Sequence, residues 1–228
     1  MQPQFRGITA MSLTTPSPPV EWTAADLANR FGPIPLRRIR FEPPPGTATE
    51  ADVVEIYDRE KRLYELVDGT LVEKTVGAYE SHLAVTLIVL LGGYVRNGGL
   101  GMVLGADGMY RLSPGLIRIP DVSFVGIDRL PGRQIPREAV TRLAPDLAIE
   151  IISRGNTREE MEQKLTDYFA AGVRQVWYIY HAPRREAHVY RARDRHDVIA
   201  EDGELDGGEI IPGFRLPLSQ LFAEPGAS

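Results

Sequence analysis

The chain has 228 residues, enough for one sizeable domain, and its 43% hydrophobic and 25% charged residues are ordinary for a globular protein. It contains no cysteine, which excludes disulfides, zinc–thiolate sites, iron–sulfur clusters and cysteine nucleophiles. The formal net charge of −5 argues against a nucleic-acid coat protein, which is usually basic, but it is compatible with an enzyme that binds a metal through carboxylates.

The N-terminal region gives no sign of export. Residues 1–20 carry scattered Thr, Ser and Pro and no continuous apolar stretch of the kind found in secretory signals. The longest apolar run, Leu83 to Leu91, is shorter than the roughly 20 residues that a helix needs to span a bilayer. We therefore expect a cytoplasmic protein that does not bind membranes.

Composition divides the chain into three parts. Residues 1–20 are typical of a flexible tail rich in Pro, Ser and Thr. Residues 21–49 are predicted to form an N-terminal helix, with Thr23 and Asp26 spaced as a capping box, and a Pro-rich linker. Residues 50–228 are predicted to form the main domain.

Capping signals and apolar stripes predict further helices over about 50–60, from Leu83 to Gly98 and from Thr157 to Ala171. Strands are predicted where apolar residues alternate or run together: Leu63–Val67, Thr70–Lys74, 101–112, Ile119–Val125, Leu147–Ile152, Val176–Tyr180 and Ala187–Tyr190. Asp68-Gly69 is a hairpin signal between the first two strands, and Ser113-Pro114-Gly115 is expected to join the next two. This order predicts an α/β (α+β) fold in which helices flank one mixed central sheet.

An acidic residue lies in the most apolar of the predicted strands. Glu150 shares one face of Leu147–Ile152 with Ala148 and Ile152, because successive side chains alternate between faces. A carboxylate in such a place is rarely buried without a partner or a metal ion. Glu150 is therefore the first candidate for a functional residue.

Asp121 is placed in a similar way, after Pro120 and before a run of apolar residues. If the two strands are neighbours, Asp121 and Glu150 can share one face of the sheet. Two carboxylates held together without a cation repel each other, which raises the pKa of one of them. With Mg²⁺ they would be the one or two carboxylate ligands of a site that keeps waters and binds a substrate phosphate.

Lysines are rare, since only Lys61, Lys74 and Lys164 among the 26 basic residues are lysines. Their number matters because the pKa of arginine is too high for proton transfer. Lys164 lies on the flank of the inward stripe of the helix that begins at Thr157, so it can reach over the strand ends. An ammonium there would stabilise the charge that develops at a phosphorus centre, or orient the attacking water.

These elements together resemble a known group of nucleases. Pro120-Asp121, then Glu150 to Ser153, then a helix with Lys164 and Tyr168-Phe169, is similar to the PD-(D/E)XK nuclease superfamily, and more narrowly to the restriction endonuclease family of the Uma-two type. Further matches to that family are Tyr64 to Gly69, Ala171-Gly172-Val173, Trp177 and Pro212-Gly213-Phe214. The resemblance covers residues 50–222 and implies a restriction-endonuclease-like domain over 50–228.

The resemblance implies roles for five residues. Asp121 and Glu150 would be the metal ligands, with Mg²⁺ as the cofactor and Mn²⁺ as a substitute for it. Lys164 would be the catalytic lysine. Glu65 would be an accessory acid near the site, and His82 would approach the site from the preceding helix.

The chain departs from that pattern at two positions. The superfamily motif usually puts a lysine two residues after the glutamate, where this chain has Ile152. The narrower family is similar in moving the lysine onto the following helix, which is the role that Lys164 would fill. Arg154 stands where the family more often has proline, and we have no physical account of that difference.

The function that the resemblance implies is a Mg²⁺-dependent endonuclease that cuts DNA by attack of water on phosphorus. Two cuts on a duplex would favour a homodimer. Two other interpretations of the same residues stay open. One is a nucleic-acid-binding protein on a nuclease-like scaffold without catalysis. The other is an interaction or structural module in which Glu150 and Lys164 form a buried ion pair.

Each candidate residue also has a structural interpretation. Lys164 could pair with Glu160, one helical turn earlier. Asp121 could cap a turn or accept backbone amides. Glu65 could be an exposed acid beside a hairpin turn, and His82 could be a hydrogen-bonded structural histidine.

Overall fold

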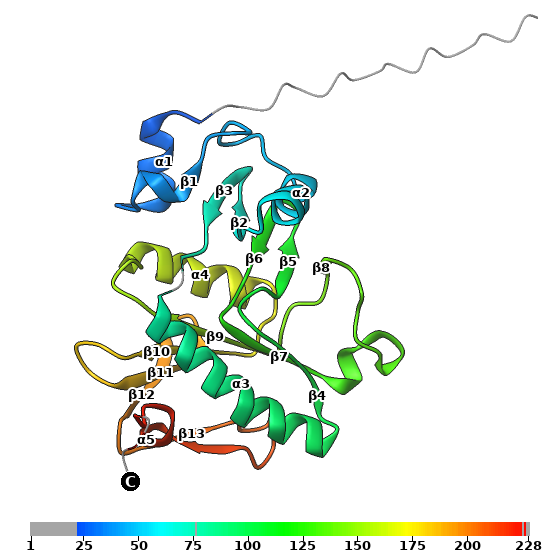
Figure 1. Ribbon diagram of the computed structural model, residues 1–228, viewed down its shortest axis with the longest axis vertical. Helices are drawn as coiled ribbons and strands as arrows, with labels where there is room; N and C mark the ends of the chain where they lie inside the picture. Colours follow the sequence, from blue (N-terminus) through cyan, green and yellow to red (C-terminus); the bar gives the residue numbers. More distant parts are fainter. Residues whose placement is uncertain (1–21, 76, 225, 227–228) are drawn as a thin grey trace, which may run out of the picture.

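The computed structural model describes residues 22–75, 77–224 and 226, so the tail predicted at residues 1–20 lies outside the described part (Figure 1). Most of the strands in the described chain belong to two mixed six-stranded sheets. The first sheet has the order β1-β3-β2-β6-β5-β8, and the second has the order β12-β11-β10-β9-β7-β4. The predicted mixed α/β class is confirmed, but the strands that we expected in one sheet belong to two.

The first sheet consists of short strands: β1 (Ile39–Arg40), β2 (Tyr64–Val67), β3 (Thr70–Glu73), β5 (Met109–Ser113), β6 (Leu116–Arg118) and β8 (Val140–Thr141). The second sheet consists of β4 (Gly101–Leu104), β7 (Val122–Gly126), β9 (Leu147–Ile152), β10 (Gln175–Tyr180), β11 (Glu186–Ala192) and β12 (Arg195–Ala200). A small sheet pairs β13 (Glu204–Asp206) with β14 (Arg215–Pro217). The helices are α1 (Ala24–Phe31), α2 (Glu50–Glu60), α3 (Ala78–Gly98), α4 (Arg158–Ala170) and α5 (Leu218–Leu221).

The chain passes between the two sheets twice on its way from β4 to β7. The predicted strand 101–112 is two strands, because residues 105–108 turn the chain from β4 in the second sheet to β5 in the first. The Ser113-Pro114-Gly115 turn then joins β5 to β6 within the first sheet. Residues 119–121 carry the chain back to β7. Asp121 therefore lies where the chain passes between the sheets.

The hairpin predicted at Asp68-Gly69 joins β2 to β3. Both turn residues have a positive φ, 48° and 72°, as a two-residue type I′ turn requires. Gly69 is also required by space, because a Cβ atom there would lie 2.5 Å from the backbone of Gly46. The backbone N–H groups of Gly46 and Ala48 donate to the Gly69 carbonyl, which fixes the Pro-rich segment against the first sheet.

The N-terminal segment packs onto the first sheet. The capping box predicted at Thr23 begins α1, and the apolar face of α1, with Leu27 and Phe31, packs together with Val67 and Val72. Strand β1 pairs with β3. The domain boundary predicted at residue 49 stays a prediction, but both α1 and β1 contact the first sheet across it.

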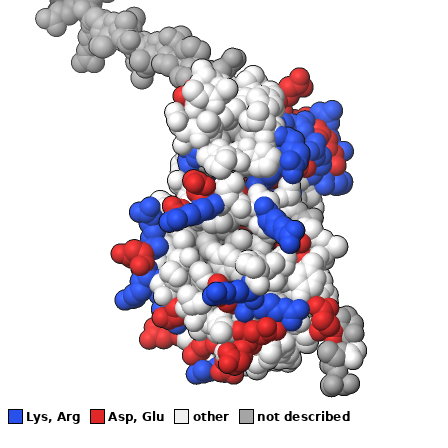
Figure 2. Space-filling view, turned by 90° about the vertical axis from the view of Figure 1, so that its left-hand side faces the viewer, with Lys and Arg blue, Asp and Glu red and all other residues white. Residues whose placement is uncertain are grey.

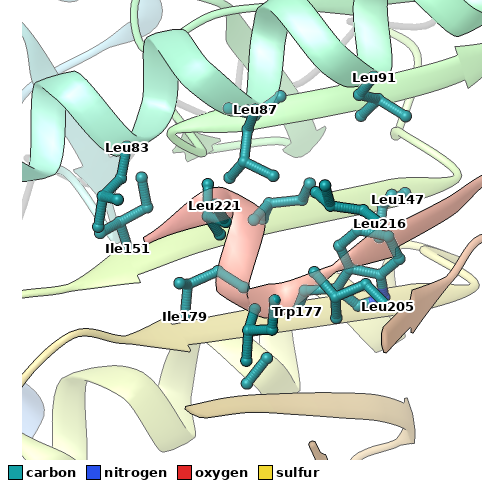
Figure 3. Packing of buried hydrophobic residues seen from close by; sticks show 14 of the residues in the cluster. Leu83, Leu87, Leu91, Leu147, Ile151, Trp177, Ile179, Leu205, Leu216 and Leu221 are labelled. Carbon is teal, nitrogen blue, oxygen red and sulfur yellow. The ribbon is translucent and has the colours of Figure 1, made fainter. Parts of the chain in front are cut away.

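Helix α3 covers one face of the second sheet, as Figure 3 shows. Leu83, Leu87 and Leu91 lie on one stripe of the helix and pack into a core with Ile151 and Trp177, which α5 and the small sheet close. By length and composition α3 could cross a membrane. Its leucine stripe is fully buried here, as in the core helix of a globular domain.

Helix α4 covers the opposite face of the second sheet. Met161 and Leu165 pack against Ala148, whereas the next residue that shares that face of β9 is the acidic Glu150. The alternation predicted for this strand is therefore present, with Ile151 toward α3 and Glu150 toward α4.

Candidate active site

Glu150 lies in β9, on the face that α4 covers. Its carboxylate is buried, and its Oε1 atom accepts hydrogen bonds from Lys164 Nζ at 3.0 Å and from the Tyr168 hydroxyl at 2.6 Å. Both donors come from α4, which begins where the Thr157 hydroxyl accepts a hydrogen bond from the backbone N–H of Glu160. This cap fixes the start of the helix and so determines which of its side chains reach Glu150.

Asp121 lies beside β9, just before β7 begins. Its backbone N–H donates to the carbonyl of Ile149 at 3.0 Å, and its Oδ2 atom accepts from the backbone N–H of Ile151 at 2.7 Å. Its Oδ1 atom lies 2.9 Å from Nζ of Lys74, which also donates to the carbonyl of Ile119 at 2.6 Å. The Asp121 carboxylate is thus held by the backbone of β9 on one side and by a lysine that follows β3 on the other.

Glu65, in β2, connects the first sheet to α4. Its Oε1 atom lies 3.0 Å from Lys164 Nζ, which also contacts Glu150. Its Oε2 atom accepts a hydrogen bond from Arg118 at 2.6 Å. The same guanidinium donates to Asp167 of α4 at 2.5 and 2.9 Å. Lys164 therefore bridges two carboxylates, one from each large sheet.

Seven charged side chains gather between the two sheets and α4, and we call them the charge cluster. They are Glu65, Lys74, Arg118, Asp121, Glu150, Lys164 and Asp167. No side chain in the cluster is more than 11% exposed. Burying a charge is costly unless it is paired, and each of the seven has an opposite charge within 3.0 Å.

The pKa values of the two glutamates shift in opposite directions. Burial alone would raise the pKa of Glu65, but the charges of Lys164 and Arg118 outweigh burial and lower the pKa to about 2. Burial raises the pKa of Glu150, and the nearby Asp121 raises it further against the pull of Lys164. Burial would lower the pKa of Lys164, but the two glutamates raise it. The cluster therefore holds one strongly ionised carboxylate and one that binds a proton more readily.

The structure brings four of the five predicted residues together, namely Glu65, Asp121, Glu150 and Lys164. Their predicted roles stay predictions. The fifth, His82, is exposed on α3 and forms none of the ion pairs of the cluster in the described part of the chain.

Of the structural interpretations given for these residues, the structure agrees with the one for Asp121 and differs from those for Lys164 and Glu65. Lys164 does not pair with Glu160, because Glu160 forms a two-pronged ion pair with Arg38 at 2.7 and 3.0 Å. Asp121 does accept a backbone amide, but it also pairs with Lys74. Glu65 is buried although it lies near a hairpin turn.

Sequence reasoning missed Lys74, Arg118 and Asp167. Lys74 carried a signal, because it is one of three lysines and is the last residue of a predicted strand. Arg118 carried one too, as a charged residue between two isoleucines just before Pro120-Asp121. Asp167 carried none, because acidic residues are common on helix surfaces. Only the tertiary structure, which brings Arg118 to α4, shows that Asp167 forms an ion pair.

A cavity of about 520 Å³ opens where the strands that lead to the cluster end. It is lined by Thr75, which follows Lys74, and by Ser153, which follows β9, together with Glu80 and His181. Within the cluster the Asp121 side chain is the most exposed. None of the seven cluster residues lines this cavity, which borders the cluster only through residues next to Lys74 and at the end of β9.

Comparison with known proteins identifies the family. Residues 50–219 match the Uma2 family, which is described as "Putative restriction endonuclease". The chain belongs to this family. Among curated proteins no relative matches. Among solved structures, the fold is similar to a crystal structure described as that of "a putative nuclease belonging to DUF820" from Anabaena variabilis, with a TM-score of 0.61 and 17% identity over 71% of this chain and 90% of that chain.

A divalent cation fits the residues that the Uma2 resemblance assigns to it. Asp121 and Glu150 carry carboxylate oxygens, the ligands that Mg²⁺ prefers, and on Asp121 Oδ1 the ion would take the place of the Lys74 ammonium. Glu150 takes both of its hydrogen bonds on Oε1, so Oε2 has no protein donor among the described residues. In the same part of the chain no group of three His, Cys, Asp or Glu residues could hold an ion, so waters and a substrate phosphate would complete the coordination.

Proposed function

We propose that this chain is a Mg²⁺-dependent endonuclease that hydrolyses phosphodiester bonds of DNA in the cytoplasm. The observation that carries the proposal is the meeting of Asp121, Glu150 and Lys164 in a member of the Uma2 family. The family and the similar crystal structure are both described as nucleases, which supports a phosphodiester substrate.

Within this proposal each residue has a distinct task. Asp121 and Glu150 would hold Mg²⁺, which when bound lowers the pKa of a water and neutralises charge on a phosphate. Lys164 would keep its proton, because the carboxylates around it raise its pKa, and would stabilise the negative charge that develops at phosphorus. Glu65 would act as a positioning residue, because it holds Lys164 from the side opposite Glu150.

The outer surface has little charge preference on the face that Figure 2 shows, where basic and acidic side chains alternate around uncharged areas. This agrees with the net charge of −5. DNA would then be held mainly at the site and by local basic groups, and less by a broad electrostatic surface. We expect binding to depend less steeply on salt than in strongly basic nucleases.

The decisive test is cleavage of supercoiled plasmid with Mg²⁺ or Mn²⁺. We expect Asp121→Asn and Glu150→Gln each to reduce the rate by about a hundredfold or more, because each removes a group that acts on the developing charge. Asp107→Asn is the matched control, since Asp107 is exposed in the β4–β5 turn. If both site variants cut as fast as the parent while circular dichroism shows the same fold, the proposal is wrong.

Titration calorimetry gives a second measurement that does not depend on cleavage. Saturable Mg²⁺ or Mn²⁺ binding to the parent, lost in Glu150→Gln and kept in Asp107→Asn, would identify Glu150 as a ligand. The oligomeric state belongs to the same set of experiments, because a homodimer would place two sites on the two strands of a duplex.

One observation favours a second candidate function, a non-catalytic nucleic-acid-binding or interaction protein on the same scaffold. The Glu150–Lys164 pair is buried, and each charge has an opposite charge within 3.0 Å, as a structural ion pair requires. A double-mutant cycle with Glu150→Gln and Lys164→Met would then show strong coupling in stability. Strong coupling together with no metal-dependent cleavage by the parent would favour this candidate.

A further inference from the structure

The outer part of the second sheet carries a row of aromatic rings on one face. Strand alternation and register place Tyr178 and Tyr180 of β10, His188 and Tyr190 of β11, and His196 of β12 on the same face. This is also the face of Glu150, because Glu150 pairs with Tyr178 and Tyr178 pairs with His188 across adjacent strands. Helix α4 covers the β9–β10 part of the face.

The rings lie close enough to form one continuous surface. The centroid of His188 lies 4.6 Å from that of Tyr180 and 5.0 Å from that of His196, with which it is stacked at an angle of 18°. Tyr190 lies 4.6 Å from His196 and 5.2 Å from Tyr178. The β11–β12 side of this surface is open, since His196 is exposed and the neighbouring Val198 is 54% exposed.

A cavity of about 570 Å³ lies over these rings, and we call it the ring groove. One wall is formed by Tyr180, His188, Tyr190 and His196, and the other by the start of α4 with Arg158 and Met161. This volume lies within the range of cavities that hold small organic ligands, roughly 300–1,000 Å³. The groove is therefore large enough for one or two nucleotide units.

Cationic side chains stand on both walls of the ring groove. Arg193, in the turn between β11 and β12, lines the groove, is exposed and forms no ion pair within the described part of the chain. Arg158 lines the other wall and is paired with Glu162, which also lines the groove, as does Asp194 next to Arg193. Flat rings that can stack with bases, next to a guanidinium that can bind a phosphate, are the elements of a site for single-stranded nucleic acid.

We propose that the ring groove binds unstacked bases of a single-stranded segment of nucleic acid, with Arg193 on its phosphates. The inference rests on the proposed function, because it takes the substrate of the Glu150 site to be a nucleic acid. It adds that the substrate reaches the sheet with bases out of the stack, as in a frayed end, loop or bulge. Glu150 and His188 are two strands apart on one face, about 10 Å, and α4 covers Glu150 and Tyr178 on the side next to the ring groove.

The test compares labelled oligothymidylate with a blunt duplex of equal length in fluorescence anisotropy. We expect the parent to bind the single strand, and His196→Ala to weaken that binding about tenfold, in line with the loss of one stacking partner. His196→Phe keeps a ring and should restore binding, which a role in folding or charge would not explain. Tyr57→Ala is the control, because Tyr57 is a half-buried tyrosine of α2, in the separate core beside the first sheet.

Arg193→Ala should weaken binding of the single strand and reduce its dependence on salt. If His196→Ala and Arg193→Ala, both at exposed positions, bind the single strand as tightly as the parent, the inference is wrong. Cleavage distinguishes this failure from failure of the proposed function. If the parent cuts DNA but His196→Ala and Arg193→Ala bind the single strand as tightly as the parent, only the ring-groove inference is overturned. A parent that binds single strands through the ring groove but cuts nothing with metal overturns the nuclease alone.

Discussion

Two regions beside α4 handle charge in opposite ways. The charge cluster lies under the part of the helix that carries Lys164 and Asp167, and every charge in it is buried and paired. The ring groove lies beside the first turns of the same helix, where Arg158 is mostly exposed and Arg193 has no ionic partner in the described residues.

The contrast shows that burial decides what a charge does for the protein. In the cluster, water cannot replace a lost partner, so removal of one group leaves another unsatisfied. In the ring groove water screens the charges, so they contribute little to stability and remain free to bind a ligand. We therefore expect cluster substitutions to lower the free energy of unfolding, and ring-groove substitutions to affect binding alone.

The largest effect on stability is expected for Arg118→Met. It would leave Glu65 with one cation and Asp167 with none, both buried. Breaking a buried pair in this way costs about 3–5 kcal/mol of unfolding free energy, which urea denaturation can measure. Adding Glu65→Gln should recover part of the loss. A change below about 1 kcal/mol would mean that water reaches the cluster and would break the contrast with the ring groove.

Acid should weaken the cluster through Glu65. The pKa of Glu65 is about 2 in the folded protein, whereas a glutamate in the unfolded chain has a pKa of 4.5. The stability that Glu65 contributes is therefore present above pH 4.5 and is lost as the pH falls toward 2. The shift corresponds to a loss on the order of 3 kcal/mol. Glu150 acts in the opposite sense, because its raised pKa makes protonation favourable to the fold.

Unfolding in urea at a series of pH values between 6 and 2 would measure this dependence. In Glu65→Gln the decline of stability with acid should be shallower than in the parent. An equal decline in both proteins would assign acid sensitivity to other carboxylates and would contradict the shift described for Glu65.

Much of this arrangement was predictable from local patterns. The alternation around Glu150 and the capping signal at Thr157 predicted the two elements that meet at the cluster. The Asp68-Gly69 hairpin was predicted because its turn needs two residues with positive φ. Such features depend only on residues that are neighbours in the sequence.

The division into two sheets and the partners of the cluster were not predictable in this way. Residues 105–108 gave no sign that the chain changes sheets there, because a turn within one sheet uses the same residue types. Glu160 was expected to interact locally, yet Arg38 reaches it from 122 residues away. Ion pairs of this kind depend on how separate elements pack, and no local pattern contains that information.

The smallest effect is expected for Arg158→Met, at the rim of the ring groove. Arg158–Glu162 and Arg38–Glu160 lie near the same end of α4, and both have a shortest contact of 2.7 Å. Their burial differs, because the side chains of the first pair are 84% and 53% exposed and those of the second are 5% and 7% exposed. Equal distance with unequal burial makes them a matched pair.

We expect Arg158→Met to leave the midpoint of urea denaturation unchanged within error, because water can replace the lost ion pair. Arg38→Met should lower the stability by about 3 kcal/mol, less than Arg118→Met, because only Glu160 would stay buried without its cation and Asn156 would still donate to it. Similar losses in the two variants would show that distance, and not burial, sets the strength of these pairs. If water did not screen exposed charges, leaving Arg193 without an ionic partner at the groove would destabilise the protein. The lack of such a partner among the described residues would then need an explanation other than ligand binding.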